Sequence, residues 1–218
     1  TITDPRDTSL TRGKRLLAYV ALTKPRIIEL LLITTVPAML VAEGGWPDTM
    51  LVVLTVVGGT LSAGGANAIN NVVDRDIDAK MRRTRHRPMP AHRVEVKDGL
   101  IVGLVLGVAG FVVLWLGANL AAAVLATAAL GFYVLVYTLV LKRTTTQNIV
   151  IGGAAGAIPA VVGWTAVTGS ADLASWVMFG VVFAWTPAHF WALAVRFRDD
   201  YEAAGVPMLP VVADHEID

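Results

Sequence analysis

Long stretches without a charged residue constrain this chain more than any other feature of its sequence. Four intervals contain no Asp, Glu, Lys or Arg: Thr49–Val73, Gly99–Leu141, Thr144–Ala171 and Leu173–Val195. The shortest has 23 residues, whereas a helix needs about 20 apolar residues to cross the hydrocarbon core of a bilayer. Only 16% of the residues are charged and 55% are hydrophobic. A water-soluble globular domain is therefore excluded.

The intervals predict an all-α fold, a polytopic membrane helix bundle with six transmembrane helices. Gly99–Leu141 has 43 residues and would make a helix of about 65 Å, so we expect it to fold back once, at Gly117-Ala118-Asn119. A weaker span, Ile27–Ala42, supplies the first helix and continues an amphipathic approach segment. Glu29 lies at its start and Pro37 inside it.

The chain is interpreted as a single membrane-embedded domain over residues 1–218, with residues 1–21 as an N-terminal arm. A signal peptide is not expected, because the first 26 residues are polar and no small-residue cleavage site follows the first apolar run. The chain begins without Met and stops at Asp218 just after an amphipathic stretch, which favours a fragment. Cysteine is absent, which excludes disulfides and cysteine metal sites.

The basic residues predict the orientation in the membrane. All 18 Lys and Arg precede the first helix or follow the second, fourth and sixth. The other loops carry only Glu43, Asp48 and Asp172 as charges. By the positive-inside rule, the N-terminus and the even-numbered helix ends face the cytoplasm, as in a cytoplasmic (inner) membrane protein. Because topology explains the basic residues, no nucleic-acid partner is inferred.

Polar residues extend from the second predicted helix into the loop after it. On a helix, Asn67, Asn70, Asp74 and Asp78 share one face because they lie three or four residues apart, while Asp76 points away. Two carboxylates four residues apart repel each other unless a cation lies between them. Oxygen donors of this kind suit Mg²⁺, which shares its coordination shell with phosphate oxygens.

An arginine cluster follows this acidic motif: Arg82, Arg83, Arg85 and Arg87. Its guanidinium groups offer forked donors for phosphate. The alternative is a solvated loop in which Asp and Arg side chains merely offset each other. Polar residues that reach back into a membrane helix favour the functional interpretation.

A second acidic loop follows the sixth predicted helix. It contains Asp199 and Asp200 after Arg196, and its Val206-Pro207-Met208-Leu209-Pro210 ending resembles Arg87-Pro88-Met89-Pro90 as a faint internal repeat. Two acidic clusters at one depth can face each other across a bundle and hold metal ions around a single diphosphate, stabilising the charge on the leaving group. A solvated helix end is the alternative.

Three further features concern the later helices, and the first two have two interpretations each. Lys142 and Arg143 end the fourth helix and either bind phosphate or act as snorkelling anchors. His189, seven residues before Arg196, either contacts an acceptor substrate or satisfies backbone polarity near Pro187. The small-residue run at 152–157 favours close helix packing without chemistry of its own.

The motif Asn70-x3-Asp74-x3-Asp78 resembles the first aspartate-rich motif of the UbiA superfamily of intramembrane prenyltransferases. The stretch from Leu22 to Val212 resembles the haem-farnesylating branch of that superfamily. The resemblance implies nine helices around a central cavity, the last three lying beyond Asp218. It also implies Mg²⁺-dependent transfer of a farnesyl group from farnesyl diphosphate to a vinyl group of haem B, with addition of water, giving haem O and diphosphate.

The resemblance also assigns roles. Catalytic candidates are Asp74, Asp78, Asp199 and Asp200. Metal ligands are Asn70, Asp74, Asp78 and Asp200. Substrate contacts are Asn67, Asn70, Arg82, Lys142, Arg143, His189 and Arg196. One departure concerns the second motif, usually Asp-x3-Asp, because no second Asp stands at that spacing from Asp199 or Asp200.

Membrane lipid is a further expected partner, and the resemblance leaves room for proteins that handle haem or assemble terminal oxidases. Two other functions stay open. The first is a prenyltransferase acting on a quinone-type or chlorophyll-type ring. The second is a cation transporter, which is disfavoured because the carboxylates lie at one interface and transporter sites lie near the midplane.

Overall fold

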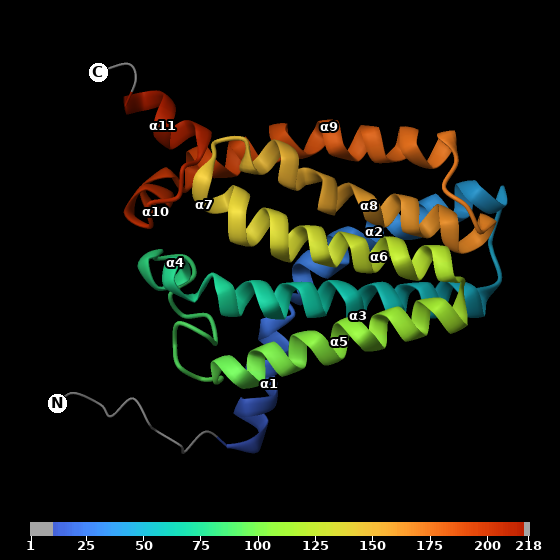
Figure 1. Ribbon diagram of the computed structural model, residues 1–218, viewed down its shortest axis with the longest axis horizontal. Coiled ribbons are helices and arrows are strands. Elements are labelled where there is room, and N and C mark those ends of the chain that lie inside the picture. Colours follow the sequence, from blue (N-terminus) through green and yellow to red (C-terminus); the bar gives the residue numbers. More distant parts are fainter. Residues whose placement is uncertain (1–10, 216–218) are drawn as a thin grey trace.

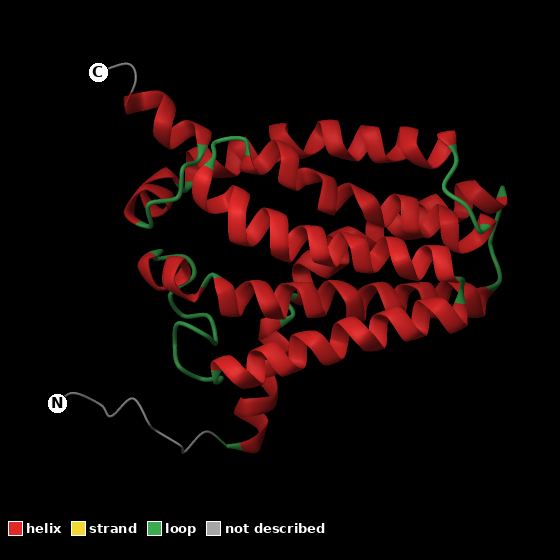
Figure 2. Cartoon of the chain, in the orientation of Figure 1, coloured by secondary structure: helices red, strands yellow, loops and turns green. Residues whose placement is uncertain are grey.

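The computed structural model describes residues 11–215, and this part of the chain is a bundle of helices joined by short loops (Figures 1 and 2). Six stretches are long and apolar enough to cross a membrane: α2 (Pro25–Glu43), α3 (Thr49–Val73), α5 (Val96–Gly117), Leu120–Thr144, α8 (Asn148–Thr168) and α9 (Leu173–Arg196). The prediction of an all-α membrane bundle with six spans is confirmed.

The long charge-free interval turns where the sequence predicted. Helix α5 ends at Gly117, and α6 (Leu120–Gly131) begins after Asn119. The Asn119 side chain accepts a hydrogen bond from the Ala122 N–H at 2.9 Å and donates one to the Thr165 carbonyl at 2.8 Å. It therefore caps one helix, which satisfies an otherwise unpaired N–H, and ties the turn to α8.

The fourth span changes its winding halfway. After α6 the chain continues as a π-helix, η1 (Phe132–Leu141), and then as the single turn α7 (Lys142–Thr144). π-Helical segments are rare and concentrate at functional sites. Here the altered winding sets the direction of the side chains in the last turns before Arg143.

Helices α3 and α5 pack closely along much of their length. A Cβ atom added at Gly65 would lie 2.6 Å from the Gly103 carbonyl oxygen, and one added at Gly110 would lie 2.6 Å from the Ser62 nitrogen. Only glycine allows the two backbones to approach this far. In the small-residue run of α8, an added Cβ would lie 2.3 Å from the Tyr137 side chain at Gly152 and 3.0 Å from the Thr186 side chain at Gly153, which agrees with the predicted close packing.

Four short helices gather at the ends of the spans: α1 (Arg12–Leu22), α4 (Arg75–Lys80), α10 (Arg198–Ala203) and α11 (Leu209–His215). α4 and α10 lie at the same end of the bundle (Figure 1). Buried apolar side chains from both, including Ile77 and Tyr201, form one cluster with Met81 and Met208. The two acidic loops therefore pack together. The first ten residues of the predicted N-terminal arm lie outside the described residues.

The central cavity and three further helices that the resemblance implies remain predictions. The packing of α3 on α5 fixes the end of α3 and thereby holds the polar residues that follow it.

Candidate active site

The asparagines of α3 hold the chain before α2. Asn67 donates a hydrogen bond to the Thr23 carbonyl at 2.9 Å, and Asn71 donates one to the Leu22 carbonyl at 2.8 Å. Both asparagines are buried. Buried amides of this kind are usually satisfied by backbone groups, and here they fix the junction between α1 and α2. Asn67, predicted as a substrate contact, therefore has a structural partner.

The fixed junction places Lys24 at the end of α3. The Lys24 Nζ donates a hydrogen bond to Asn70 Oδ1, and the Lys24 backbone is left-handed with φ of 53°. A non-glycine residue in this region carries strain that the surrounding structure must support. Burial, together with the nearby Arg87 and Lys142, lowers the pKa of Lys24 to about 7, against the opposing effect of the carboxylates.

Asn70 and Asp74 form the buried centre of the site. Asn70 Nδ2 donates to Asp74 Oδ2 at 2.8 Å and to Thr138 Oγ1 at 3.0 Å. Lys142 Nζ donates to the same Asp74 oxygen. The other oxygen, Asp74 Oδ1, is buried without a hydrogen-bond partner among the described residues. An unsatisfied buried carboxylate oxygen is costly, so this atom is available to a ligand.

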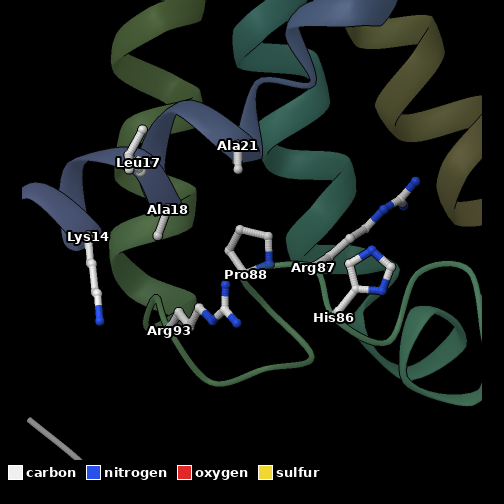
Figure 3. Close-up of a pocket in the computed structure, with 8 residues that line it drawn as sticks. All are labelled: Lys14, Leu17, Ala18, Ala21, His86, Arg87, Pro88 and Arg93. Atoms are coloured by element: carbon white, nitrogen blue, oxygen red, sulfur yellow. The ribbon is translucent and has the colours of Figure 1, made fainter. Parts of the chain in front are cut away.

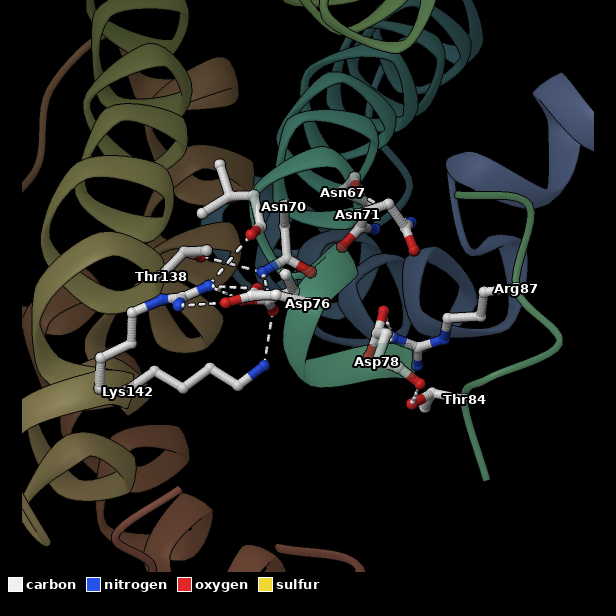
Figure 4. A network of polar contacts seen from close by, with 12 residues as sticks. Asn67, Asn70, Asn71, Asp76, Asp78, Thr84, Arg87, Thr138 and Lys142 are labelled. Atoms are coloured by element: carbon white, nitrogen blue, oxygen red, sulfur yellow. Dashed lines mark hydrogen bonds and ion pairs between the residues drawn. The ribbon is translucent and has the colours of Figure 1, made fainter. Parts of the chain in front are cut away.

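Asp78 faces the other side of the short helix α4. Its two oxygens accept hydrogen bonds from Arg87 Nη1 at 3.0 and 2.9 Å, and its backbone carbonyl accepts one from Thr84 at 3.1 Å. Figure 4 shows Asp78 with Arg87 and Thr84 on one side and Thr138 with Lys142 on the other. The predicted single helical face is thus interrupted, because α3 ends at Val73 and α4 begins at Arg75.

The π-helix brings two of these contacts to the site. Thr138 donates a hydrogen bond to the Tyr133 carbonyl, five residues earlier, at 2.8 Å, while its oxygen receives the Asn70 amide. Lys142, one turn later, reaches Asp74. With ordinary α-helical winding the two side chains would point elsewhere, since the angle per residue differs.

Asp76 lies outside the buried centre, as the sequence predicted. Its side chain is 59% exposed, and its two oxygens accept hydrogen bonds from Arg143 at 2.8 Å each. Hydrogen bonding from Arg143 lowers the pKa of the Asp76 carboxyl to about 2, against a smaller opposing effect of burial. Arg143, predicted to bind diphosphate, is thus paired with Asp76 and lies 3.8 Å from Asp74.

The second acidic loop contributes Asp200, which is buried against the first loop. Its carboxylate accepts hydrogen bonds from the backbone N–H groups of Arg82 and Arg83 at 3.2 and 3.1 Å and from Arg82 Nε at 3.4 Å. Burial raises the pKa of the Asp200 carboxyl, and these hydrogen bonds lower it by a larger amount. The pKa therefore lies below its ordinary value. Asp199 is exposed, 3.7 Å from Arg82.

Arg196 and His189 have aromatic neighbours. The Arg196 guanidinium lies 5.6 Å from the centre of the Phe197 ring, and Arg83 lies 5.1 Å from it. The contact of Arg83 with Phe197 attaches the two loops to each other. His189 stacks on Trp185 with ring centres 4.4 Å apart. It is partly buried on α9, at a distance along that helix from the acidic residues.

Sequence reasoning assigned no role to Lys24 and Thr138 and treated Arg87 only as part of the arginine cluster. Lys24 lies 46 positions before Asn70, and Thr138 lies 68 positions after it, so no local spacing relates them. The one local signal is Lys24-Pro25, since a proline at the first helical position marks a helix start.

The donor types of Asn70, Asp74 and Asp78 suit a magnesium ion beside a diphosphate, while in this structure Arg87 binds both Asp78 oxygens and Lys24 binds Asn70 Oδ1. Within residues 11–215, no group of three or more His, Asp or Glu side chains is close enough to hold a metal ion. Two carboxylates and one amide oxygen are hard oxygen donors, and Mg²⁺ usually takes only one or two carboxylates beside phosphate oxygens. Asp74 Oδ1 accepts no hydrogen bond among the described residues and lies 3.8 Å from Arg143. Together with the nearby Lys24, Lys142 and Arg87, it suits a bound, negatively charged metal complex.

Comparison with known proteins places this arrangement in a family. The model of the UbiA prenyltransferase family matches residues 31–216. Protoheme IX farnesyltransferase 1 of Saccharopolyspora erythraea is 63% identical over 198 residues, which cover 91% of this chain and 64% of that protein. A protoheme IX farnesyltransferase of Mycolicibacterium gilvum is 54% identical, with 99% of this chain and 69% of that protein covered. The chain thus spans about two thirds of the length of these relatives.

Solved structures share the fold at low sequence identity. A digeranylgeranylglyceryl phosphate synthase structure superposes with a TM-score of 0.74 at 19% identity, covering 91% of this chain and 69% of that one. A UbiA homologue from Archaeoglobus fulgidus, bound to GPP and Mg²⁺, superposes with a TM-score of 0.64 at 16% identity, covering 89% and 69%. The helix arrangement and the family match agree, and the chain belongs to the UbiA prenyltransferase family.

Proposed function

We propose that this chain forms most of an intramembrane prenyltransferase that transfers a farnesyl group from farnesyl diphosphate to a vinyl group of haem B. The observation that carries the proposal is the buried set of Asn70, Asp74 and Asp78 at the end of α3, with Lys142 and Arg87 against the two carboxylates. The 63% identity to a protoheme IX farnesyltransferase supports the choice of acceptor.

In this proposal the first acidic motif holds the diphosphate end of the donor. Asn70, Asp74 and Asp78 would hold Mg²⁺, which adds positive charge against the leaving diphosphate when bound. Lys24 and Lys142 face the same buried carboxylate–amide pair and supply further positive charge. The GPP and Mg²⁺ in the Archaeoglobus homologue are consistent with this assignment.

The chemistry requires one bond to break and one to form. The allylic C–O bond of farnesyl diphosphate breaks, and its electron pair leaves with the diphosphate. Cations fixed around Asp74 and Asp78 lower the energy of that separation because they are already in place when the charge develops. The vinyl group of haem B then attacks the allylic carbon, and water adds to the resulting cation with loss of a proton, giving haem O.

The second loop takes a supporting part in the proposal. Asp200 and Asp199 remain candidates to complete the metal site, although the Asp200 carboxylate accepts backbone hydrogen bonds here. Three arginines are candidate hydrogen-bond donors to the phosphate groups: Arg82, whose guanidinium is largely exposed, Arg143 and Arg196.

His189 is the proposed contact with the acceptor. It lies on α9 beside Trp185, and a flat, largely apolar haem packs well against aromatic side chains. The proposal places the N-terminus and the acidic end of the bundle on the cytoplasmic side of the cytoplasmic membrane. Proteins that handle haem or assemble terminal oxidases are its proposed partners.

The test uses the full-length protein in membranes with Mg²⁺, farnesyl diphosphate and haem B. Mass analysis should find a hydroxyethylfarnesyl haem together with released diphosphate. His189→Ala should lower haem conversion and leave the binding of farnesyl diphosphate nearly unchanged, because His189 lies away from the acidic residues. Prenylation of an aromatic acid or quinone precursor, with haem left unmodified, would show that such a ring and not haem is the acceptor.

A further inference from the structure

A pocket of about 640 Å³ opens between α1 and the loop after α4 (Figure 3). Lys14 and Leu17 line it from α1, and His86, Arg87, Pro88 and Arg93 line it from the loop. Arg87 also holds Asp78, but the other lining residues take no part in the acidic site. The pocket is therefore a neighbour of the candidate active site and not a portion of it.

The pocket is positively charged. Its lining contains Lys14, Arg87 and Arg93 and no Asp or Glu. Of these three cations, only Arg87 forms an ion pair with a carboxylate among residues 11–215. Lys14 and Arg93 have no such partner within the described part of the chain. Positive charge gathered in a concave surface favours a negatively charged ligand.

The pocket also has an apolar wall, formed by Leu17, Ala18 and Ala21 of α1. Leu17 is 68% exposed, and Leu16 and Val20, which lie on α1 outside the pocket lining, are 65% and 47% exposed. A helix with exposed leucines and with lysines and arginines at one end is typical of the lipid–water interface. α1 directly precedes the first membrane span. A lipid bound in this pocket would thus contact the basic side chains with its headgroup and the apolar side chains of α1 with its acyl chain.

We propose that this pocket binds the phosphate of an anionic phospholipid, with Lys14 and Arg93 donating to the phosphate oxygens. The glycerol and the upper acyl chain lie along Leu17 and the neighbouring surface of α1. Basic pockets beside membrane helices bind anionic headgroups by this combination of charge and apolar contact. The proposal does not depend on the reaction that the protein catalyses.

The test is a lipid titration of the full-length protein, purified in detergent, with short-chain phosphatidylglycerol. Native mass spectrometry measures the dissociation constant of the first bound lipid, with phosphatidylcholine, a zwitterion of zero net charge, as the comparison. Lys14→Gln/Arg93→Gln should raise the dissociation constant for phosphatidylglycerol by roughly fivefold for each charge removed. The dissociation constant for phosphatidylcholine should rise by less, because the choline cation offsets the charge of its phosphate.

The matched control removes two charges from the same side of the protein outside the pocket, by Arg85→Gln/Lys97→Gln. Both residues are exposed, so the control should bind phosphatidylglycerol like the unmodified protein. Equal affinity in the pocket variant and the unmodified protein would overturn the proposal, as would an equal loss in the control. The single variant Lys14→Gln, at an exposed position, repeats the test if the double variant does not fold.

Inorganic phosphate separates a lipid site from a site for free anions. At constant ionic strength, phosphate should compete weakly, because it lacks the contact with Leu17. Displacement of phosphatidylglycerol by phosphate at the concentration at which the lipid itself binds would assign the pocket to a free anion and overturn the lipid proposal.

Discussion

Lys24 donates a hydrogen bond to Asn70 across the junction between α1 and α2 and the end of α3. The contact depends on two neighbours of Asn70 in α3, because Asn67 and Asn71 hold the carbonyls of Thr23 and Leu22. Lys24 is thereby kept in a left-handed conformation that a lysine alone would not favour. The polar face of α3 thus has two uses: two asparagines hold the chain, and Asn70 receives the cation.

The first prediction concerns Lys24. Lys24→Asn should weaken the binding of farnesyl diphosphate by roughly 10-fold or more, because it removes a charge-assisted contact. Asparagine tolerates the left-handed backbone, so the folded yield should stay close to that of the unmodified protein. Steady-state kinetics and chromatographic yield are the measurements. Unchanged kinetics would remove Lys24 from the site.

The second prediction compares three aspartates. Asp74→Asn and Asp78→Asn should each reduce turnover on the order of 10²-fold or more, because each removes a buried negative charge from the proposed metal site. Asp76→Asn should cost only a few-fold, because Asp76 is exposed and paired with Arg143. Initial rates at saturating Mg²⁺ measure all three. Three equal losses would contradict the division between buried and exposed aspartates.

The third prediction concerns acid stability. Because the pKa of Asp76 is lowered from 3.8 to about 2 in the folded protein, its contribution to stability is complete above pH 4 and is lost as the pH falls toward 2. The thermal midpoint of the unmodified protein should exceed that of Asp76→Asn by a small margin above pH 4. The two midpoints should converge as the pH approaches 2, and a difference that persists at pH 2 would argue against this pair.

The fourth prediction concerns the contact between the acidic loops. Asp200→Asn should leave one of the Arg82 and Arg83 N–H groups without an acceptor. The equilibrium constant for opening of the loop should therefore rise by about 10-fold. Trypsin should then cleave after these arginines faster than in the unmodified protein. Asp199→Asn is the matched control, because Asp199 is exposed and lies 3.7 Å from Arg82. Equal cleavage in both variants would mean that Asp200 does not hold the loops together.

The fifth prediction concerns orientation. Reporter domains fused after Glu43, Asn119 and Asp172 should lie outside the cytoplasm, and those fused after Lys97 and Arg143 should lie inside it. The pattern of basic residues requires this alternation. A reporter after Arg87 that lies outside would place the acidic site on the opposite side of the membrane.

The polar contacts of the site were only partly predictable. Helical spacing predicted that Asp74 and Asp78 are buried and Asp76 is exposed, but not the break between α3 and α4 that gives Asp74 and Asp78 different partners. Nor did it predict their cationic partners. Arg87 lies nine residues after Asp78 across a loop, and Lys142 lies 68 residues after Asp74. Neither distance along the chain specifies a distance in space.

The six spans, the turn before Asn119 and the acidic motif at the end of α3 were all predictable from the amino-acid sequence. Each rests on local physics: the length of apolar runs against the thickness of a bilayer, and the period of a helix. Tertiary structure decided which groups meet there. The glycine contact between α3 and α5 fixes the end of α3, and the π-helix turns Thr138 and Lys142 toward it. Such contacts depend on packing between distant segments, and a local pattern carries no information about them.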